Sequence, residues 1–257
     1  MKPHLLLVHS FPTNSLLLHG LEEFLSDFFI VHFIDLPGFH RNSPPFDGKI
    51  SLEKFSQYLD QEIEKLDVDE YIVGGVSFGF LVVNNAKLDR RCKAILAIEP
   101  FINSRSLNAS LRKGYAALSL LMKILLFFHI EKTIWKAKWF SEYLHNESNY
   151  PQERIEMIIN HIDAQTFFSV ATLLMSYKKE PLFHTEIPYY LIGNFEDKTV
   201  NFDSIVEIFK KSISQLNIIS VPIDHYPVDP TKKYFEKKIP AETMHQIIVS
   251  LSQKTTD

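Results

Sequence analysis

The sequence predicts an α/β protein in which helices flank a mostly parallel sheet and a helical segment is inserted near the middle of the chain. Short runs of aliphatic and β-branched residues alternate with longer amphipathic stretches, the pattern of parallel strands joined by crossover helices. The region 101–182 breaks this alternation, because it is rich in helix formers and aromatic residues and contains no convincing strand. A length of 257 residues suits one folding unit that carries such an insertion.

The strands of the sheet are expected where aliphatic runs are short and bounded by turn residues. These segments are Leu5–Val8, Phe29–Asp35, Glu70–Gly74, Ala94–Ile98, Tyr189–Ile192 and Leu216–Pro222. The amphipathic stretches of the core predict helices at Ser15–Leu25, Leu52–Leu66, Phe78–Leu88 and Ser204–Gln215. A last helix is expected to run through Leu251, because Pro240 fits the first helical turn.

The insertion is expected to form a helical cap over residues 101–182, while residues 1–100 and 183–257 form the core. Its helices are predicted at Tyr115–Phe128, Thr133–Tyr143, Gln152–His161 and Ala164–Tyr177. The apolar stretch Leu118–Phe128 is interpreted as packing of the cap on the core, with lining of a lipophilic acyl pocket as the alternative. The lysines that follow it are interpreted as a solvated surface.

The composition of the chain indicates which kinds of partner and which cellular compartment to expect. The chain has 27 Lys and Arg against 31 Asp and Glu, a net charge of -4, so a nucleic-acid partner is not expected. Cys92 is the one cysteine, which excludes an internal disulfide and favours a reducing compartment, so we expect a cytoplasmic protein. The most hydrophobic stretch is shorter than the ~20 apolar residues of a spanning helix, and no transmembrane segment is predicted.

The segment that carries the chemistry is Tyr71–Gly79, where a predicted strand runs into Gly75-Val76-Ser77-Phe78-Gly79 and then into a predicted helix. A nucleophilic serine needs this setting, since a sharp strained turn lifts its hydroxyl above the sheet. Glycines on either side let the neighbouring backbone pass without a Cβ clash. The context of strand, turn and helix therefore indicates a nucleophile at Ser77.

On these residues the sequence resembles the α/β-hydrolase family, and two N-terminal segments match the family in the same order. Leu5–Pro12 is similar to the family's strand followed by a His-Gly-x-Pro loop, and Asp35–Ser43 to its Asp-x-Pro-Gly-x-Gly-x-Ser loop. The resemblance covers the core on both sides of the insertion but not the cap. Ser10 and His40 stand where the family has glycine, so altered loop paths are expected.

The resemblance implies the remaining members of the site. Backbone amides of Phe11 and Phe78 would bind the oxyanion, and His225, in a segment similar to the family's Gly-His-x-Pro ending, would be the base. Asp224 replaces the usual glycine before this histidine. The acid is expected in the loop after the strand at 189–192, with Asp197 favoured over Glu196 because of its spacing to a following hydrophobic residue.

The expected function is therefore that of a carboxylesterase-like serine hydrolase with a Ser77–His225–Asp197 triad and a small-molecule acyl substrate, which could be lipophilic. Thioester, lactone or carbon–carbon hydrolysis and acyl transfer use the same constellation and stay open. So do a non-catalytic small-molecule binder that kept the fold and a membrane-surface lipase that uses its cap helix. Neither a metal site nor a nucleotide cofactor is expected, because histidine pairs with zinc spacing and glycine-rich phosphate fingerprints are missing from the sequence.

Overall fold

The computed structural model describes residues 2–148 and 150–253, and a six-stranded sheet lies at its centre. The strand order is β2-β1-β3-β4-β5-β6, and every neighbouring pair is parallel. The strands are β1 (His4–Val8), β2 (Ile30–Ile34), β3 (Tyr71–Val76), β4 (Cys92–Ile98), β5 (Tyr189–Gly193) and β6 (Leu216–Ser220). All six predicted strands are confirmed, with ends that differ by up to two residues.

Helices cover both faces of this sheet. Successive side chains of a strand point to opposite faces, and apolar side chains on both faces are buried by these helices. One face packs against α2 (Leu52–Lys65), α3 (Phe78–Asn85) and α9 (Phe202–Ser212). The other packs against α1 (His19–Ser26), α10 (Lys232–Lys238) and α11 (Ala241–Gln253). The sequence analysis missed α10, a short lysine-rich helix whose one buried residue is Phe235.

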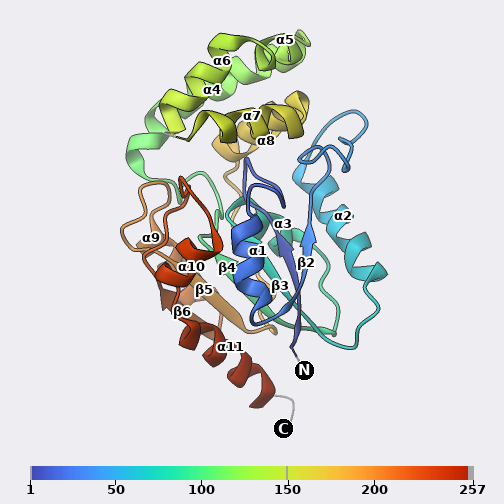
Figure 1. The fold of residues 1–257 in the computed structure, drawn as a ribbon, viewed down its shortest axis with the longest axis vertical. Coiled ribbons are helices and arrows are strands. Elements are labelled where there is room, and N and C mark those ends of the chain that lie inside the picture. Colours follow the sequence, from blue (N-terminus) through green and yellow to red (C-terminus); the bar gives the residue numbers. More distant parts are fainter. Residues whose placement is uncertain (1, 149, 254–257) are drawn as a thin grey trace.

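The region between β4 and β5 is helical, as predicted, and lies over the carboxyl ends of the strands (Figure 1). Its helices are α4 (Ala109–Phe127), α5 (Glu131–Trp135), α6 (Lys138–Ser148), α7 (Gln152–His161) and α8 (Ala164–Ser176). The helix expected over Thr133–Tyr143 is in fact two, since the chain turns between Trp135 and Lys138.

This helical region has two layers. Helices α7 and α8 lie next to the core, and α4, α5 and α6 lie farther out, with α4 and α5 packed on α8 and α6 packed on α7 (Figure 1). The interpretation of Leu118–Phe128 as simple packing is wrong for half of the stretch, because one side of α4 stays exposed, as described below. None of the helices in the described ranges has the length and hydropathy needed to cross a bilayer.

Candidate active site

Ser77 occupies a sharp turn between β3 and α3. Its backbone has φ 49° and ψ −109°, a left-handed conformation that is strained for a residue with a side chain. The Ser77 N–H donates to the Ile98 carbonyl at 2.9 Å, which ties the turn to the end of the neighbouring strand. The predicted strand–turn–helix setting of the serine is thus present.

The glycines beside this turn are required by close backbone contacts. A Cβ on Gly75 would lie 2.4 Å from the Phe80 Cα, and one on Gly79 would lie 2.3 Å from the Val8 carbonyl oxygen. Neither neighbour is a flexible side chain that could move aside. Both positions of the Gly-x-Ser-x-Gly motif therefore serve the packing of the turn against β1 and α3.

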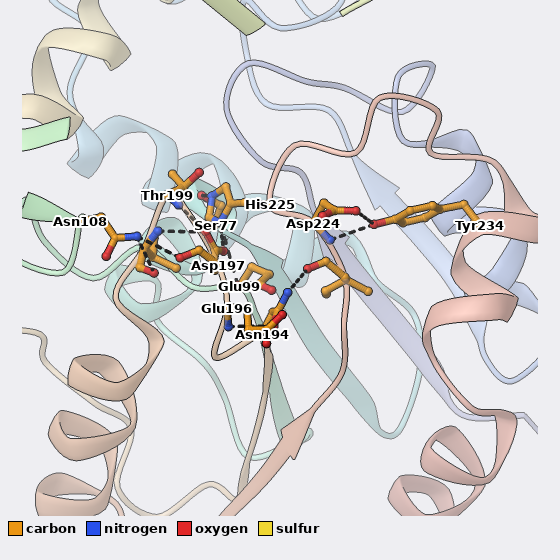
Figure 2. Close-up of polar contacts among 12 residues, drawn as sticks. Ser77, Glu99, Asn108, Asn194, Glu196, Asp197, Thr199, Asp224, His225 and Tyr234 are labelled. Atoms are coloured by element: carbon orange, nitrogen blue, oxygen red, sulfur yellow. Dashed lines mark hydrogen bonds and ion pairs between the residues drawn. The ribbon is translucent and has the colours of Figure 1, made fainter. Parts of the chain in front are cut away.

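The hydroxyl of Ser77 meets an imidazole that comes from far along the chain. Ser77 Oγ and His225 Nε2 are 2.9 Å apart, and His225 Nδ1 lies 2.9 Å from Asp197 Oδ2. Figure 2 shows the three side chains together, Ser77 from the turn after β3, Asp197 from the loop after β5 and His225 from the loop after β6. The structure thus brings together the three residues predicted from the sequence.

The carboxylate of Asp197 is held by its own loop. Its Oδ1 accepts the backbone N–H groups of Thr199 and Val200, and Asn108 Nδ2 donates to its backbone carbonyl at 2.9 Å (Figure 2). Burial by itself would raise the pKa of Asp197, but the hydrogen bond and charge of His225 outweigh it and the pKa is lowered. Asp197 is therefore ionised beside the imidazole. Glu196, the alternative acid, is exposed to solvent.

Glu99 is a second carboxyl group at this site that the sequence analysis missed. It follows β4 directly, has φ 42°, is 2% exposed, and its Oε2 lies 4.0 Å from His225 Nδ1. Burial, and after it the neighbouring Asp197, raises the pKa of Glu99 to about 10, so this group is neutral near pH 7. Its position at the carboxyl end of a parallel strand is the sequence signal that could have identified it.

The residues that depart from the family pattern have defined places in the structure. Ser10 Oγ bonds Thr13 Oγ1 at 2.9 Å, and the Ser10 carbonyl accepts from His9 Nδ1 at 2.8 Å. His9 Nε2 in turn accepts the N–H of Leu36 at 3.1 Å. Burial lowers the pKa of His9, and the neutral ring has the one donor and one acceptor that these bonds need. The first loop is thereby fixed to the second.

The other two departures also make contacts. The His40 ring stacks on His161 of α7 with ring centres 5.4 Å apart, so it joins the second loop to the cap. The Asp224 carboxylate accepts from the Tyr234 hydroxyl at 2.7 Å, and that hydroxyl accepts the Asp224 N–H at 2.8 Å (Figure 2). This pair fixes the backbone just before His225. None of these departures from the family pattern replaces Ser77, His225 or Asp197.

Comparison with known proteins agrees with this architecture. The family model of the alpha/beta hydrolase fold matches residues 3–121. Similar solved structures include a hydrolase from Pseudomonas aeruginosa, with TM-score 0.67 and 16% identity over 96% of this chain and 89% of that chain. This chain has the α/β-hydrolase fold.

Two further solved structures of this kind are an esterase from Thermogutta terrifontis and the enol-lactonase from Burkholderia xenovorans. The first has TM-score 0.64 and 16% identity over 98% of this chain and 90% of that chain. The second has TM-score 0.61 and 15% identity over 98% of this chain and 92% of that chain. No curated protein sequence matches the chain.

The α/β-hydrolase core and the cap helices enclose a cavity of about 410 Å³ next to Ser77 and His225. Most of its wall is aromatic or aliphatic, including Phe11, Phe101, Tyr115, Tyr150, Phe167 and Tyr226. A cavity of this size and polarity fits a small organic molecule with an apolar group. Ser77 and His225 are among the few polar groups on the wall.

The two phenylalanines predicted to supply oxyanion amides come from two different elements next to this serine. Phe78 is the first residue of α3, so its N–H has no acceptor within the helix and is directed, like the helix dipole, toward the turn. Phe11 lies in the loop after β1 and lines the cavity together with Ser77. That these two amides bind an oxyanion stays a prediction.

Arg154 connects the cap to the histidine loop and carried no sequence signal. It is buried in α7, and its Nη1 donates to the carbonyls of Pro227 and Val228, two and three residues after His225. Its guanidinium also lies 4.1 Å from the ring centre of Tyr150. The position of His225 thus depends on the cap as well as on the core.

Proposed function

We propose that this protein is a serine hydrolase that cleaves an ester or a related acyl bond, with Ser77 as nucleophile, His225 as base and Asp197 as the orienting acid. The single observation that carries the proposal is the continuous chain of two 2.9 Å contacts from Ser77 Oγ through the imidazole to Asp197. Esterase and lactonase activity in proteins of the same fold agrees with this class of reaction.

The mechanism follows from the roles of these atoms. His225 Nε2 takes the hydroxyl proton as Ser77 Oγ attacks the carbonyl carbon, and ionised Asp197 stabilises the imidazolium that forms. The oxyanion accepts hydrogen bonds from the amides of Phe11 and Phe78, each worth about 3 kcal/mol in the transition state. The imidazolium then protonates the leaving alcohol, which leaves an acyl group on Ser77.

Hydrolysis of this acyl-enzyme repeats the sequence with water. His225 removes a proton from the water, the hydroxide attacks the acyl carbon, and the carboxylic acid leaves as Ser77 Oγ regains its proton. Thioesters and lactones pass through the same steps, so the shape of the cavity selects among these substrates. Its apolar wall favours acyl groups with an aliphatic or aromatic part.

Labelling with a fluorophosphonate probe tests the proposal directly. We expect covalent modification of Ser77 in the wild-type protein and none in Ser77→Ala, with p-nitrophenyl esters hydrolysed at a rate about 10⁴-fold or more above that of the variant. A panel of acyl chain lengths would then measure the usable depth of the cavity. A folded wild-type protein that neither reacts with the probe nor turns over any ester or lactone would instead be a binding protein.

A further inference from the structure

The outer layer of the cap exposes an unusual number of large apolar side chains. We define the outer cap face as Leu120, Leu121, Ile124, Phe127, Phe128, Ile130, Trp139 and Tyr143. Within the described parts of the chain, these eight are half of all exposed large hydrophobic residues, although they come from only 24 consecutive positions. Phe127 is 76% exposed and Phe128 64%. Soluble proteins rarely leave such a concentration of apolar surface without a partner.

The helical geometry gathers these side chains on one side. Leu120, Ile124 and Phe127 follow one another at spacings of four and three residues, so they lie on one face of α4. Trp139 and Tyr143 have the same relation on α6. The inner sides of α4 and α6 pack on α8 and α7, and the helices α4, α5 and α6 form the layer farthest from the sheet (Figure 1).

Basic residues accompany this apolar face. Lys123, Lys132, Lys136 and Lys138 are all exposed, although the whole chain has a net charge of -4. Two acidic residues lie within 116–143. Glu131 is buried, and Glu142 lies 3.5 Å from Lys138, so it offsets the charge of that lysine. The segment 116–143 that carries the outer cap face thus has four exposed lysines against one exposed glutamate on an anionic protein, and Glu156 of α7 shares a groove with Lys136 and Lys138.

From this combination we infer that the outer cap face docks on the surface of a membrane that contains anionic phospholipid. Helices that lie in the membrane interface have this composition, with Phe and Leu inserted at the acyl boundary and lysines at the headgroup level. Trp139 and Tyr143 suit the same depth, because their rings are apolar and their edges are polar. Each lysine near an anionic surface adds to the attraction.

A second copy of the chain fits this face less well. In a twofold dimer the same patch meets itself, so the lysines of one copy would lie close to those of the other. Such like-charge contacts oppose association. Anionic headgroups have the complementary charge.

Membrane docking would also place the cavity close to lipid. Helices α4 and α6, which carry the outer cap face, supply Leu111, Tyr115 and Leu144 to the cavity wall. A lipophilic ester could then pass from the bilayer to Ser77 along one helix pair. This last step rests on the proposed function, whereas the docking itself does not.

Vesicle flotation tests the docking independently of catalysis if the Ser77→Ala protein is used. We expect it to float with phosphatidylcholine vesicles that contain phosphatidylglycerol and to float poorly with phosphatidylcholine alone. The double variant Phe127→Glu/Phe128→Glu should bind the anionic vesicles at least about tenfold more weakly. Lys132→Glu/Lys136→Glu should lower binding by about tenfold or more, and added salt should weaken wild-type binding.

The controls change an exposed apolar residue and an exposed lysine elsewhere. Leu182→Glu replaces a side chain that is 77% exposed in the loop before β5, and Lys211→Glu replaces an exposed lysine of α9. Both should float like the parent protein, and all variants should keep its melting temperature.

Three results would overturn the inference. The first is a folded protein that binds neither kind of vesicle, and the second is binding that the Phe127→Glu/Phe128→Glu variant retains. The third is a dimer in solution that this double variant converts to a monomer, which would show that a second copy covers the face. A wild-type protein that hydrolyses no ester, while the Ser77→Ala protein still floats, would refute only the proposed function.

Discussion

The loops around Ser77 bury polar groups and give most of them partners, whereas the outer cap face leaves large apolar groups in solvent. At the first region His225 is held by Asp197, Asp197 by the backbone of its own loop, and His9 by the backbone of Leu36. At the second, Phe127 and Trp139 are more than half exposed. Folding alone explains the first arrangement but not the second, because exposed apolar area contributes nothing to the stability of the isolated chain. The contrast separates polar groups that the fold itself holds in place from apolar groups that are available to a partner.

The largest expected effect concerns Asp197, the proposed acid beside His225. Asp197→Asn should lower kcat on an ester substrate by about 10⁴-fold, because an amide can neither fix the productive tautomer nor stabilise the imidazolium. Glu196→Gln is the matched control next to it and should leave kcat unchanged, since Glu196 is exposed. The opposite ranking of the two variants would mean that Glu196 is the acid and that the loop after β5 differs in the working enzyme.

A pair of glycine variants sharpens the contrast in packing between the two regions. Gly79→Ala forces a Cβ to 2.3 Å from the Val8 carbonyl oxygen and should lower the free energy of unfolding by about 1–3 kcal/mol. Gly114→Ala in α4 meets nothing within 4 Å and should raise it by about 0.5–1 kcal/mol, because alanine favours the helix. Urea denaturation of both variants measures these changes in the free energy of unfolding. Equal effects of the two would refute the distinction between a tightly packed turn and an open cap helix.

A further expected effect concerns Glu99, whose raised pKa makes the stability of the fold sensitive to pH. Between its ordinary pKa of 4.5 and its folded value of about 10, the unfolded chain loses the proton that the folded protein keeps. The free energy of unfolding therefore falls as pH rises through this window, by about 1.4 kcal/mol per pH unit at most. Glu99→Gln cannot ionise, so its melting temperature should exceed that of the wild type increasingly toward high pH.

Activity supplies the control for the same variant. The amide that Glu99→Gln introduces is neutral and is able to donate a hydrogen bond to Asp197, as a neutral carboxyl group is, so this variant should keep the ester hydrolysis expected of the wild type. Asp197 behaves with the opposite sign: its lowered pKa stabilises the fold above its ordinary value, and this contribution is lost as the solution becomes acidic. If the melting temperatures of the wild type and of Glu99→Gln differ by the same amount at every pH, Glu99 is ionised in the folded protein.

The sequence by itself determined the sheet and the order of the site residues. Strand runs such as Ala94–Ile98 are short, aliphatic and bounded by polar turns, and the Gly-x-Ser-x-Gly context located Ser77 without any knowledge of contacts. His225 and Asp197 were implied by the resemblance of the segments after the last two strands to those of the α/β-hydrolase family. These features are local in sequence, which is why they could be predicted.

Only the tertiary structure decided which side of each helix finds a neighbour and which polar groups meet. The stretch Leu118–Phe128 has large apolar residues on both sides of α4, so its exposed side depends on where α8 lies. Glu99 and Arg154 gain their roles through contacts with residues about 100 and 70 positions away, Asp197 and Pro227. Periodicity describes a single element, whereas burial and pKa depend on what the other elements place around it.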